Sequence, residues 1–429
     1  MAVTKTKRLK LIGKMWCGIV LASLVVTGSG VRAFAGKRIR TRTKLTLHVG
    51  PNGSDSNPGS PALPFATIQH ALSVAVPKTT IKILGGQYTG PISLPAINNL
   101  SLVGQGSVLI SGNHGIISQT APMNGLTLSG LTFQDNVDDY LGSSAVSLEQ
   151  GGTGLTVKNC SFLNNGWVGL VIGDWVNVSV TNFTGSANGE NALEIYRVQN
   201  LVETGITLVG NNLVGYANGY TGWDADGEKL LRIHGGTLTN LTVTGNLTGG
   251  IWFDTDNENI TVNNLVSENN LTNGFNCEAT QGPISIKDSV IAYNGGNGLT
   301  TGSCQGLTVT NTTIYGNGKA QIQPSSNGPR TFNDYVTGAS ESVMNTAWTL
   351  THDQIGTQVS YPGGYLWGDA MASSDWAAFL SSLTSNFNDW YSPNNPDPYA
   401  LPTGITNFAG WQSYTSQDAA STQSAFAAP

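Results

Sequence analysis

The sequence predicts an all-β protein built as a parallel β-helix, and three observations support this. Between Gly227 and Gly302 the chain repeats with a period of 23 or 24 residues. Short alternating apolar and polar runs follow this period, and each is followed by a turn that contains Asn or Ser. The 54 glycines, together with 39% hydrophobic residues, favour a long repetitive body with a buried core. An antiparallel sandwich is the alternative, but the steady period and the scarcity of tight hairpins argue against it.

Residues 1–35 have the pattern of a secretory signal peptide. Basic residues in Lys5–Lys14 precede an apolar run over Met15–Val26, and Ala33-Phe34-Ala35 has the small-residue spacing of a cleavage site. A membrane anchor is the alternative, but the run is shorter than the roughly 20 residues that a spanning helix needs. We therefore expect a secreted or periplasmic protein.

The net charge indicates the kind of partner. It is −6 for the whole chain, and removal of residues 1–35 takes away six basic residues and leaves −12. Residues 36–46 form a basic linker, and beyond it the body is strongly acidic. Such a body repels nucleic acid and anionic polymers. We expect a monomer that acts on a neutral poly- or oligosaccharide, with no nucleic-acid partner and no membrane contact after cleavage.

The β-helix is expected to occupy residues 47–330. Residues 45–49 and 80–84 alternate as strands, and residues 65–75 have apolar residues at helical spacing after Pro64. From Leu100 to Gly318 the alternation predicts about nine coils. Leu193 to Glu228 is longer than the period by roughly a dozen residues, which we expect to leave the coil as a loop.

Part of the entry segment resembles a known family. His48–Asp55, Asn57–Gly59 and Pro64–Ile68 resemble the N-terminal cap of secreted right-handed parallel β-helix proteins of the pectate-lyase-like superfamily. The resemblance implies a right-handed helix and a carbohydrate-active protein.

Residues 331–429 are expected to form the last coil and a capping region. They hold 16 of the 35 aromatic residues, which favours a packed segment over a disordered tail. Phe408–Asp418 resembles a segment that closes many bacterial β-helix proteins linked to carbohydrate degradation.

Three cysteines remain beyond the signal peptide. Export permits a bridge between Cys277 and Cys304, which fall in adjacent copies of the repeat. They are three positions out of register, however, and disulfide geometry is demanding. We therefore expect buried thiols at Cys160, Cys277 and Cys304.

Two successive copies of the repeat place an acid at the same position, Asp254 in Gly250–Asp254 and Glu278 in Gly274–Glu278. Equivalent positions of stacked coils lie about 4.8 Å apart, so these acids are expected to be neighbours. With Ile251 and Phe253 pointing inward, one exposed face is expected to carry Trp252, Asp254, Asp256, Asn276 and Glu278.

Neighbouring carboxylates suit glycoside hydrolysis. Two acids so close disfavour simultaneous ionisation, so one holds a proton while the other stays charged. Retaining glycosidases hold the pair at roughly 5–5.5 Å and inverting ones at roughly 6.5–9.5 Å, and adjacent coils match the shorter range. A chance stack of acids on a polar outer surface is the structural alternative.

The same residues resemble an enzyme family. Trp252-x-Asp254 followed by Glu278-x-x-x-Gly282-Pro283 resembles the β-helical β-xylosidase family of retaining glycoside hydrolases. The resemblance implies that Asp254 is the nucleophile and Glu278 the acid/base, with no cofactor. Ile251 and Thr280-Gln281 differ from the family pattern, which puts the sugar specificity in doubt.

A second candidate site lies in Trp223–Arg232. It faintly resembles the Asp-Gly segment of calcium-dependent β-helical pectate lyases, which implies Ca²⁺ on Asp224 and Asp226 and Lys229 as the base. The oxygen ligands that would suit Ca²⁺ are Asp224, Asp226, Asp254 and Asp256. A solvated turn in which Lys229 pairs with Glu228 or Asp226 is the alternative, and a third option is that Lys229 orients Asp254.

The sequence thus predicts a retaining glycoside hydrolase, with a calcium-dependent polysaccharide lyase and a noncatalytic carbohydrate-binding protein as alternatives. The residues expected to bind substrate are Trp252, Trp223, Tyr220, Asn276, Asp256 and Arg232.

Overall fold

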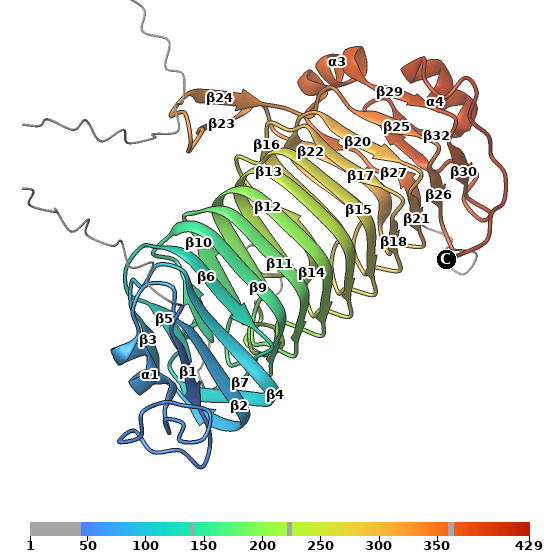
Figure 1. Ribbon diagram of the computed structural model, residues 1–429. Coiled ribbons are helices and arrows are strands. Elements are labelled where there is room, and N and C mark those ends of the chain that lie inside the picture. Colours follow the sequence, from blue (N-terminus) through green and yellow to red (C-terminus); the bar gives the residue numbers. More distant parts are fainter. Residues whose placement is uncertain (1–43, 138–140, 221–224, 359–363) are drawn as a thin grey trace, which may run out of the picture. The chain divides into compact units, whose positions relative to one another are not determined.

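The computed structural model describes residues 44–137, 141–220, 225–358 and 364–429, and these residues belong to one compact unit. Its strands pair in parallel from one coil to the next, apart from two antiparallel pairs near the C-terminal end (Figure 1). The prediction of a parallel β-helix is confirmed. The expected signal peptide and nearly all of the basic linker lie outside the described residues. Among the described residues, no helix is long and apolar enough to cross a membrane.

The coils build three parallel sheets, here named I, II and III, and long strands bend from one sheet into the next. Sheet I contains β1 (Thr46–Val49), β2 (Thr80–Thr89), β4 (Leu100–Asn113), β6 (Met123–Ser129), β9 (Gly152–Leu163), β11 (Trp175–Ser186), β12 (Leu193–Val209), β13 (Asp226–Thr244), β15 (Glu258–Glu268), β17 (Ile284–Lys287), β20 (Leu307–Thr310), β25 (Thr349–Thr351) and β29 (Thr384–Asn386). Sheet II contains the second halves of β2, β4, β9, β11, β12, β13 and β15, with β7 (Thr132–Val137), β18 (Val290–Ala292), β21 (Thr313–Tyr315), β26 (Gln354–Gly356) and β30 (Asp389–Tyr391). Sheet III contains the first parts of β12 and β13, with β3 (Ile92–Leu94), β5 (Ile117–Gln119), β8 (Val146–Leu148), β10 (Leu170–Gly173), β14 (Gly249–Phe253), β16 (Phe275–Thr280), β19 (Leu299–Cys304), β22 (Ala320–Ser326), β27 (Tyr365–Trp367), β28 (Ala370–Met371) and β31 (Tyr399–Leu401).

Single residues with left-handed backbone make the bend between sheets I and II. Asn159, Asn182, Asn240 and Asn264 have φ between 50° and 59°, and Gly205 has φ 69°. Asn and Gly adopt this conformation at low cost, so one such residue per coil turns the chain without ending the strand. The Asn-rich turns seen in the sequence are therefore the corners of the helix.

The interior is filled by columns of identical or similar apolar residues. Phe133, Phe162 and Phe183 stack at centroid distances of 4.9 and 5.0 Å, and Phe253 stacks on Phe275 at 5.2 Å. This packing follows from the register, because the same inward position recurs in each coil.

Two glutamates interrupt the apolar interior. Glu203 of β12 lies in register with Val180 and Leu238, and Glu228 of β13 lies in register with Leu193 and Ile251. Both carboxyls are fully buried and lie close enough to interact with each other. Burial raises the pKa of Glu203 to about 7, and burial together with the charge of Glu203 raises the pKa of Glu228 well above its usual range.

Buried asparagines form a ladder at the corner between sheets II and III. In each coil the side-chain amide donates to the side-chain oxygen of the next asparagine at 2.8–2.9 Å, and the backbone N–H of the same residue donates to that oxygen too. The ladder runs through Asn165, Asn188, Asn211, Asn246, Asn270, Asn294 and Asn317 and ends on Gln321. A buried polar corner is thus satisfied along its length.

We expect Asn188→Ala to lower the free energy of unfolding by about 2 kcal/mol, because it leaves buried donors of Asn165 without a partner and removes a donor to the carbonyl of Phe162. Urea unfolding followed by tryptophan fluorescence measures the change. Asn159→Gly is the matched control: Asn159 is exposed with φ 53°, so its loss should change stability by less than about 0.5 kcal/mol. Equal losses in both variants would contradict a special role of the ladder.

The coils continue beyond the expected boundary at residue 330. β25, β26 and β27 pair with β20, β21 and β22, and β29, β30 and β31 add a further layer. Helices α3 (Ser373–Ser382) and α4 (Phe408–Thr415) pack Trp376, Phe379 and Trp411 against this end of the core. The short β32 (Gly404–Thr406) pairs antiparallel with β31. The buried aromatic residues of this region therefore belong to the core.

Three further elements lie outside the regular coil. Helix α1 (Ile68–Val74) closes the N-terminal end and is capped by Thr67. Helix α2 (Leu213–Ala217) occupies part of the expected long loop. The antiparallel hairpin of β23 (Arg330–Asn333) and β24 (Ser340–Val343) projects from the coil after β22 (Figure 1).

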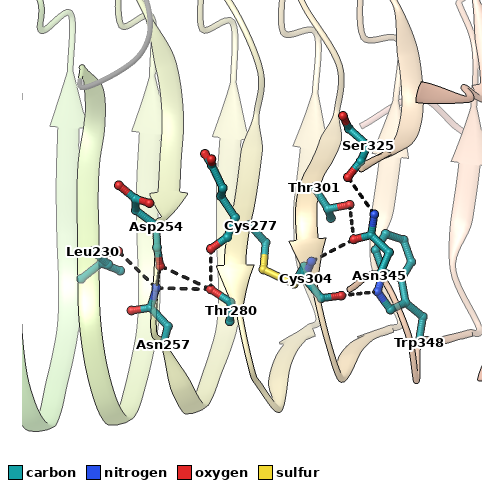
Figure 2. Close-up of a disulfide and its surroundings, with 11 residues drawn as sticks. Leu230, Asp254, Asn257, Cys277, Thr280, Thr301, Cys304, Ser325, Asn345 and Trp348 are labelled. Carbon is teal, nitrogen blue, oxygen red and sulfur yellow. Dashed lines mark hydrogen bonds between the residues drawn. A yellow bond between two sulfur atoms is a disulfide. The ribbon is translucent and has the colours of Figure 1, made fainter. Parts of the chain in front are cut away.

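The expectation of three buried thiols is wrong for two of the cysteines. Cys277 and Cys304 form a disulfide with a Cα–Cα distance of 5.7 Å (Figure 2). The register pairs Cys304 with Thr280, three positions from Cys277, but Ser303 has φ 68° and bends the chain there. Counting positions along a straight strand therefore overestimated the separation. Cys160 is a buried free thiol, and burial raises its pKa to about 11.

Candidate active site

The candidate site lies where sheet III ends and the chain turns toward sheet I. Residues with left-handed backbone make this turn in successive coils, among them Arg197, Arg232, Asp256, Ala279 and Ser303. In-out alternation stops at such a residue, so positions before it follow the strand pattern and positions after it do not. Asp254 and Glu278 lie before their turns.

Asp254 is a fixed carboxylate at the end of β14. Its Oδ1 accepts hydrogen bonds from the backbone N–H and the hydroxyl of Thr255, at 2.6 and 3.0 Å. Its Oδ2 lies 3.2 Å from the Nζ of Lys229, and its side chain is 19% exposed. Donors on both oxygens hold the carboxylate in one orientation.

Asn257 fixes the backbone of the same turn. It is fully buried, its Oδ1 accepts from Ile233 N–H at 3.0 Å, and its Nδ2 donates to the carbonyl of Asp254 (Figure 2). The acid is therefore presented from a rigid turn.

Glu278 occupies the equivalent place on β16 and is paired with Arg330. Arg330 Nη1 lies 2.7 Å from Glu278 Oε1, and the two side chains are 49% and 26% exposed. Arg330 comes from the first position of β23, so the hairpin brings a cation to an acid 52 residues earlier.

The two acids occupy equivalent positions at the ends of neighbouring strands. Trp252 pairs with Asn276 and Phe253 with Cys277, so Asp254 and Glu278 are the next residues of neighbouring strands. The hydroxyl of Thr280 is 3.3 Å from the carbonyl of Asp254 (Figure 2). It is also 2.8 Å from the carbonyl of Glu278. The expected adjacency of their backbones is thus present in the structure.

A groove of about 450 Å³ runs from Glu278 toward the later coils. Gly302 follows Glu278 in the register, and a Cβ there would lie 3.2 Å from the glutamate side chain, so the glycine keeps this position open. Hydroxyl and amide groups dominate the lining, which includes Asn276, Thr300, Thr301, Ser325, Ser326 and Asn327. Groups of this kind exchange hydrogen bonds with sugar hydroxyls.

Trp252 was expected to be exposed, but it is buried. It points outward, in register with Lys229 and Asn276, but only 7% of its surface is accessible. The Nζ of Lys229 lies 4.4 Å from its ring centroid, and the side chain of Lys229 is 7% exposed. The tryptophan and the lysine cover each other, so Trp252 supports the lysine that contacts Asp254.

Asp256 is also not exposed, because its φ of 64° turns it out of the outward row. The carboxylate is fully buried. Its Oδ1 lies 3.0 Å from His234 Nε2 and accepts from Gln281 Nε2 at 2.9 Å, while its Oδ2 accepts from Tyr335 N–H at 2.8 Å. Burial lowers the pKa of His234, but the hydrogen bond and charge of Asp256 outweigh it and raise the pKa overall. Asp256 therefore connects the hairpin of β23 and β24 to the coils of the β-helix.

The other predicted residues are only partly brought together. Asn276 lines the groove. Among the described residues, Arg232 makes no hydrogen bond or ion pair with Asp254 or Glu278. Tyr220 packs at 6.4 Å from Trp167, in an apolar cluster that lies earlier in the stack.

The proposed calcium ligands do not converge in the described part of the chain. Asp226 pairs with Gly249, at the opposite end of the strand from Asp254, and five residues of strand span roughly 16 Å. Asp256 is occupied by His234 and Gln281. Trp223 and Asp224 lie outside the described residues.

Sequence reasoning missed Arg330, Thr280 and Asn257. Arg330 is one of few basic residues in the acidic body, and that rarity was the available signal. Its contact with Glu278 depends on the hairpin, which breaks the repeat and has no register to count from.

The fold and site define a right-handed parallel β-helix with an acid-bearing groove. Residues 143–314 match a family model described as a right handed beta helix region. The chain is similar to the structure of XylC in complex with xylose, with a TM-score of 0.65, 10% identity and coverage of 82% of this chain and 85% of that one. It is also similar to the A-module of the mannuronan C-5 epimerase AlgE4 of Azotobacter vinelandii, with a TM-score of 0.53, 15% identity and coverage of 83% and 95%. No curated protein matches the sequence.

Proposed function

We propose that this protein is a carbohydrate-active enzyme that hydrolyses glycosidic bonds of a neutral glycan with retention of configuration. The observation that carries the proposal is the pair of Asp254 and Glu278 at neighbouring register positions on the outer face of sheet III. Asp254 acts as the nucleophile, because donors to both of its oxygens fix its orientation. Glu278 acts as the acid/base, because it lies beside the groove.

The geometry also orients the substrate. Glu278 lies between Asp254 and the groove, so the sugar that forms the covalent intermediate sits over Asp254 and the leaving group lies in the groove. In the ground state Arg330 pairs with Glu278. The leaving group displaces Arg330 on binding, Glu278 then takes up a proton from solvent, and it delivers this proton to the glycosidic oxygen as the bond to the anomeric carbon breaks. The exposure of Arg330 makes this exchange inexpensive.

A second candidate is β-elimination from an acidic polysaccharide. The observation that favours it is the presence of Lys229 and Arg330 beside the two acids, since cations of this kind bind a uronate carboxylate. In that reaction Lys229 is the base, which requires release from Asp254. The acidic body of the protein favours the neutral substrate.

The disulfide supports the proposal that the protein acts outside the cytoplasm. Bonds such as Cys277–Cys304 persist in oxidising compartments and are rare in the cytosol. This agrees with the signal peptide predicted for residues 1–35.

A panel of aryl glycosides and polysaccharides tests the proposal. Aryl xylosides belong in it because XylC is described with xylose, and uronate polymers belong in it to test elimination. Release of reducing sugar without ultraviolet absorbance of an unsaturated uronate is the expected result, with the first product retaining the anomeric configuration by NMR. Absorbance that disappears with chelator would establish the calcium-dependent lyase instead, and binding without product would establish a carbohydrate-binding protein.

Lys229→Met is expected to lower kcat for hydrolysis by about 10- to 100-fold, because Asp254 loses one of its orienting partners. Lys229→Arg should recover part of this loss, since it restores a cation near Oδ2. Steady-state kinetics on the best aryl glycoside measure both variants. Complete loss in both, with elimination activity in the wild type, would identify Lys229 as a base.

A further inference from the structure

A second cluster of potential ligands lies beside the candidate active site. His234, Glu258 and Asp334 each place one donor atom within 4.8 Å of the others. His234 and Glu258 are register partners on β13 and β15 of sheet I. Asp334 follows β23 in the hairpin. Three separate segments therefore meet at one point.

The imidazole of His234 is held in the orientation that metal-binding histidines adopt. Asp256 Oδ1 lies 3.0 Å from its Nε2, and Asp256 is itself fixed by Gln281 and Tyr335. A carboxylate behind one ring nitrogen fixes the tautomer that leaves the other nitrogen as a ligand. Nδ1 is the nitrogen left for this purpose.

The cluster has an excess of negative charge. Asp256, Glu258 and Asp334 surround one imidazole, and no Lys or Arg in the described part of the chain pairs with any of the three carboxylates. Asp256 is fully buried, and Asp334 is 6% exposed. Buried carboxylates are stable when a cation compensates them.

Each carboxylate also keeps an oxygen for a ligand role. Asp334 Oδ1 accepts from the backbone N–H groups of Val336 and Thr337 at 2.8 and 2.7 Å, which leaves Oδ2. Glu258 Oε1 accepts from Asn259 Nδ2 at 2.9 Å, which leaves Oε2.

We propose that His234, Glu258 and Asp334 bind one divalent transition-metal ion of the zinc or manganese type, with water completing the coordination. One imidazole with two carboxylates suits these ions, whereas Ca²⁺ takes six to eight oxygen ligands. The site goes beyond the proposed hydrolase activity and uses neither Asp254 nor Glu278. Its ion fastens the hairpin to sheet I and so fixes the segment from which Arg330 reaches Glu278.

Metal analysis of the full secreted chain tests the proposal. After dialysis against Zn²⁺ or Mn²⁺ and removal of excess ion, the wild type should retain about one equivalent by elemental mass spectrometry. His234→Ala and Asp334→Asn should reduce the affinity at least tenfold in calorimetric titration with the same ions. Asparagine at position 334 keeps an acceptor for the two backbone N–H groups, so this variant preserves the turn.

Matched controls come from the same chain. His70→Ala, on α1, and Glu341→Gln, in β24 of the same hairpin, should retain the full equivalent. Addition of Zn²⁺ or Mn²⁺ should raise Tm in the wild type and both controls, and leave it unchanged in His234→Ala and Asp334→Asn. Retention of neither ion by the wild type, binding of Ca²⁺ alone, or equal binding by all variants would overturn the proposal. These readouts do not depend on whether the chain hydrolyses a glycoside.

Discussion

Asp254→Asn is expected to lower kcat for glycoside hydrolysis by roughly 10³-fold or more on every substrate, whatever its leaving group. An amide cannot form the covalent intermediate, and the ion pair with Lys229 is lost as well. The overall shape of the side chain is kept, and acceptance from Thr255 remains available to the amide oxygen. Stopped assays of released sugar measure the loss, and circular dichroism verifies the fold. Added azide should recover activity in Asp254→Ala by attacking the anomeric carbon directly.

Glu278→Gln should behave differently, which separates the two roles. Its loss should be about 10²- to 10⁴-fold on natural glycosides and much smaller on aryl glycosides whose leaving group needs no proton. Sugar binding measured by calorimetry should be unchanged. Asp288→Asn, which removes an exposed acid at a left-handed corner, is the control and should keep full activity. Full activity of Asp254→Asn or Glu278→Gln would contradict the proposed mechanism.

Replacing the two buried glutamates of the interior, Glu203 and Glu228, by leucine is expected to stabilise the protein at neutral and alkaline pH. In the folded protein burial raises the pKa of both Glu203 and Glu228, that of Glu203 to about 7. In the unfolded chain they ionise near pH 4.5. Between these values the folded state binds more protons, so the free energy of unfolding falls as pH rises.

Leucine fits these positions, since the neighbouring coils carry Val180 and Leu238 beside Glu203 and Leu193 and Ile251 beside Glu228. Denaturant unfolding of the wild type and Glu203→Leu/Glu228→Leu from pH 5 to pH 9 measures the effect. The wild type should lose stability steadily over this range, and the double variant should lose much less. Glu268→Gln, at a partly exposed position of β15, should keep the wild-type slope. Parallel slopes in the wild type and the double variant would show that the pair is not protonated in the folded state.

Most of the fold follows from the sequence because each coil repeats one local pattern. The period near 23 gives the register, and the register places Asp254 beside Glu278 without any knowledge of long-range contacts. Side-chain direction can be predicted wherever alternation continues, as in Ile251 and Phe253, which point inward.

Alternation fails at residues with left-handed backbone, and the errors in the site occur there. Asp256 was expected to be exposed because the in-out alternation was counted through its turn. The disulfide between Cys277 and Cys304 was not predicted because the turn at Ser303 brings the two residues closer than a straight strand would. The predicted exposure of Trp252 was wrong for another reason. Its side chain points outward as expected, but Lys229 packs over the ring. Arg330 and Asp334 lie in a hairpin that interrupts the period, and their contacts with the coils are tertiary.

The asparagine ladder makes the distance between two coils independent of the number of residues in a coil. The step from Asn211 to Asn246 spans 35 residues, against 23 from Asn188 to Asn211, yet the amide-to-oxygen distance is 2.9 Å in both. The spacing of the coils therefore does not depend on how many residues lie between two asparagines of the ladder, provided that the second asparagine occupies the same position in its coil. Loops can be lengthened, exchanged or grafted at this corner during evolution or in the laboratory while the acids on sheet III keep their spacing. A new binding loop between Asn211 and Asp226 would test how large an insertion the chain accepts.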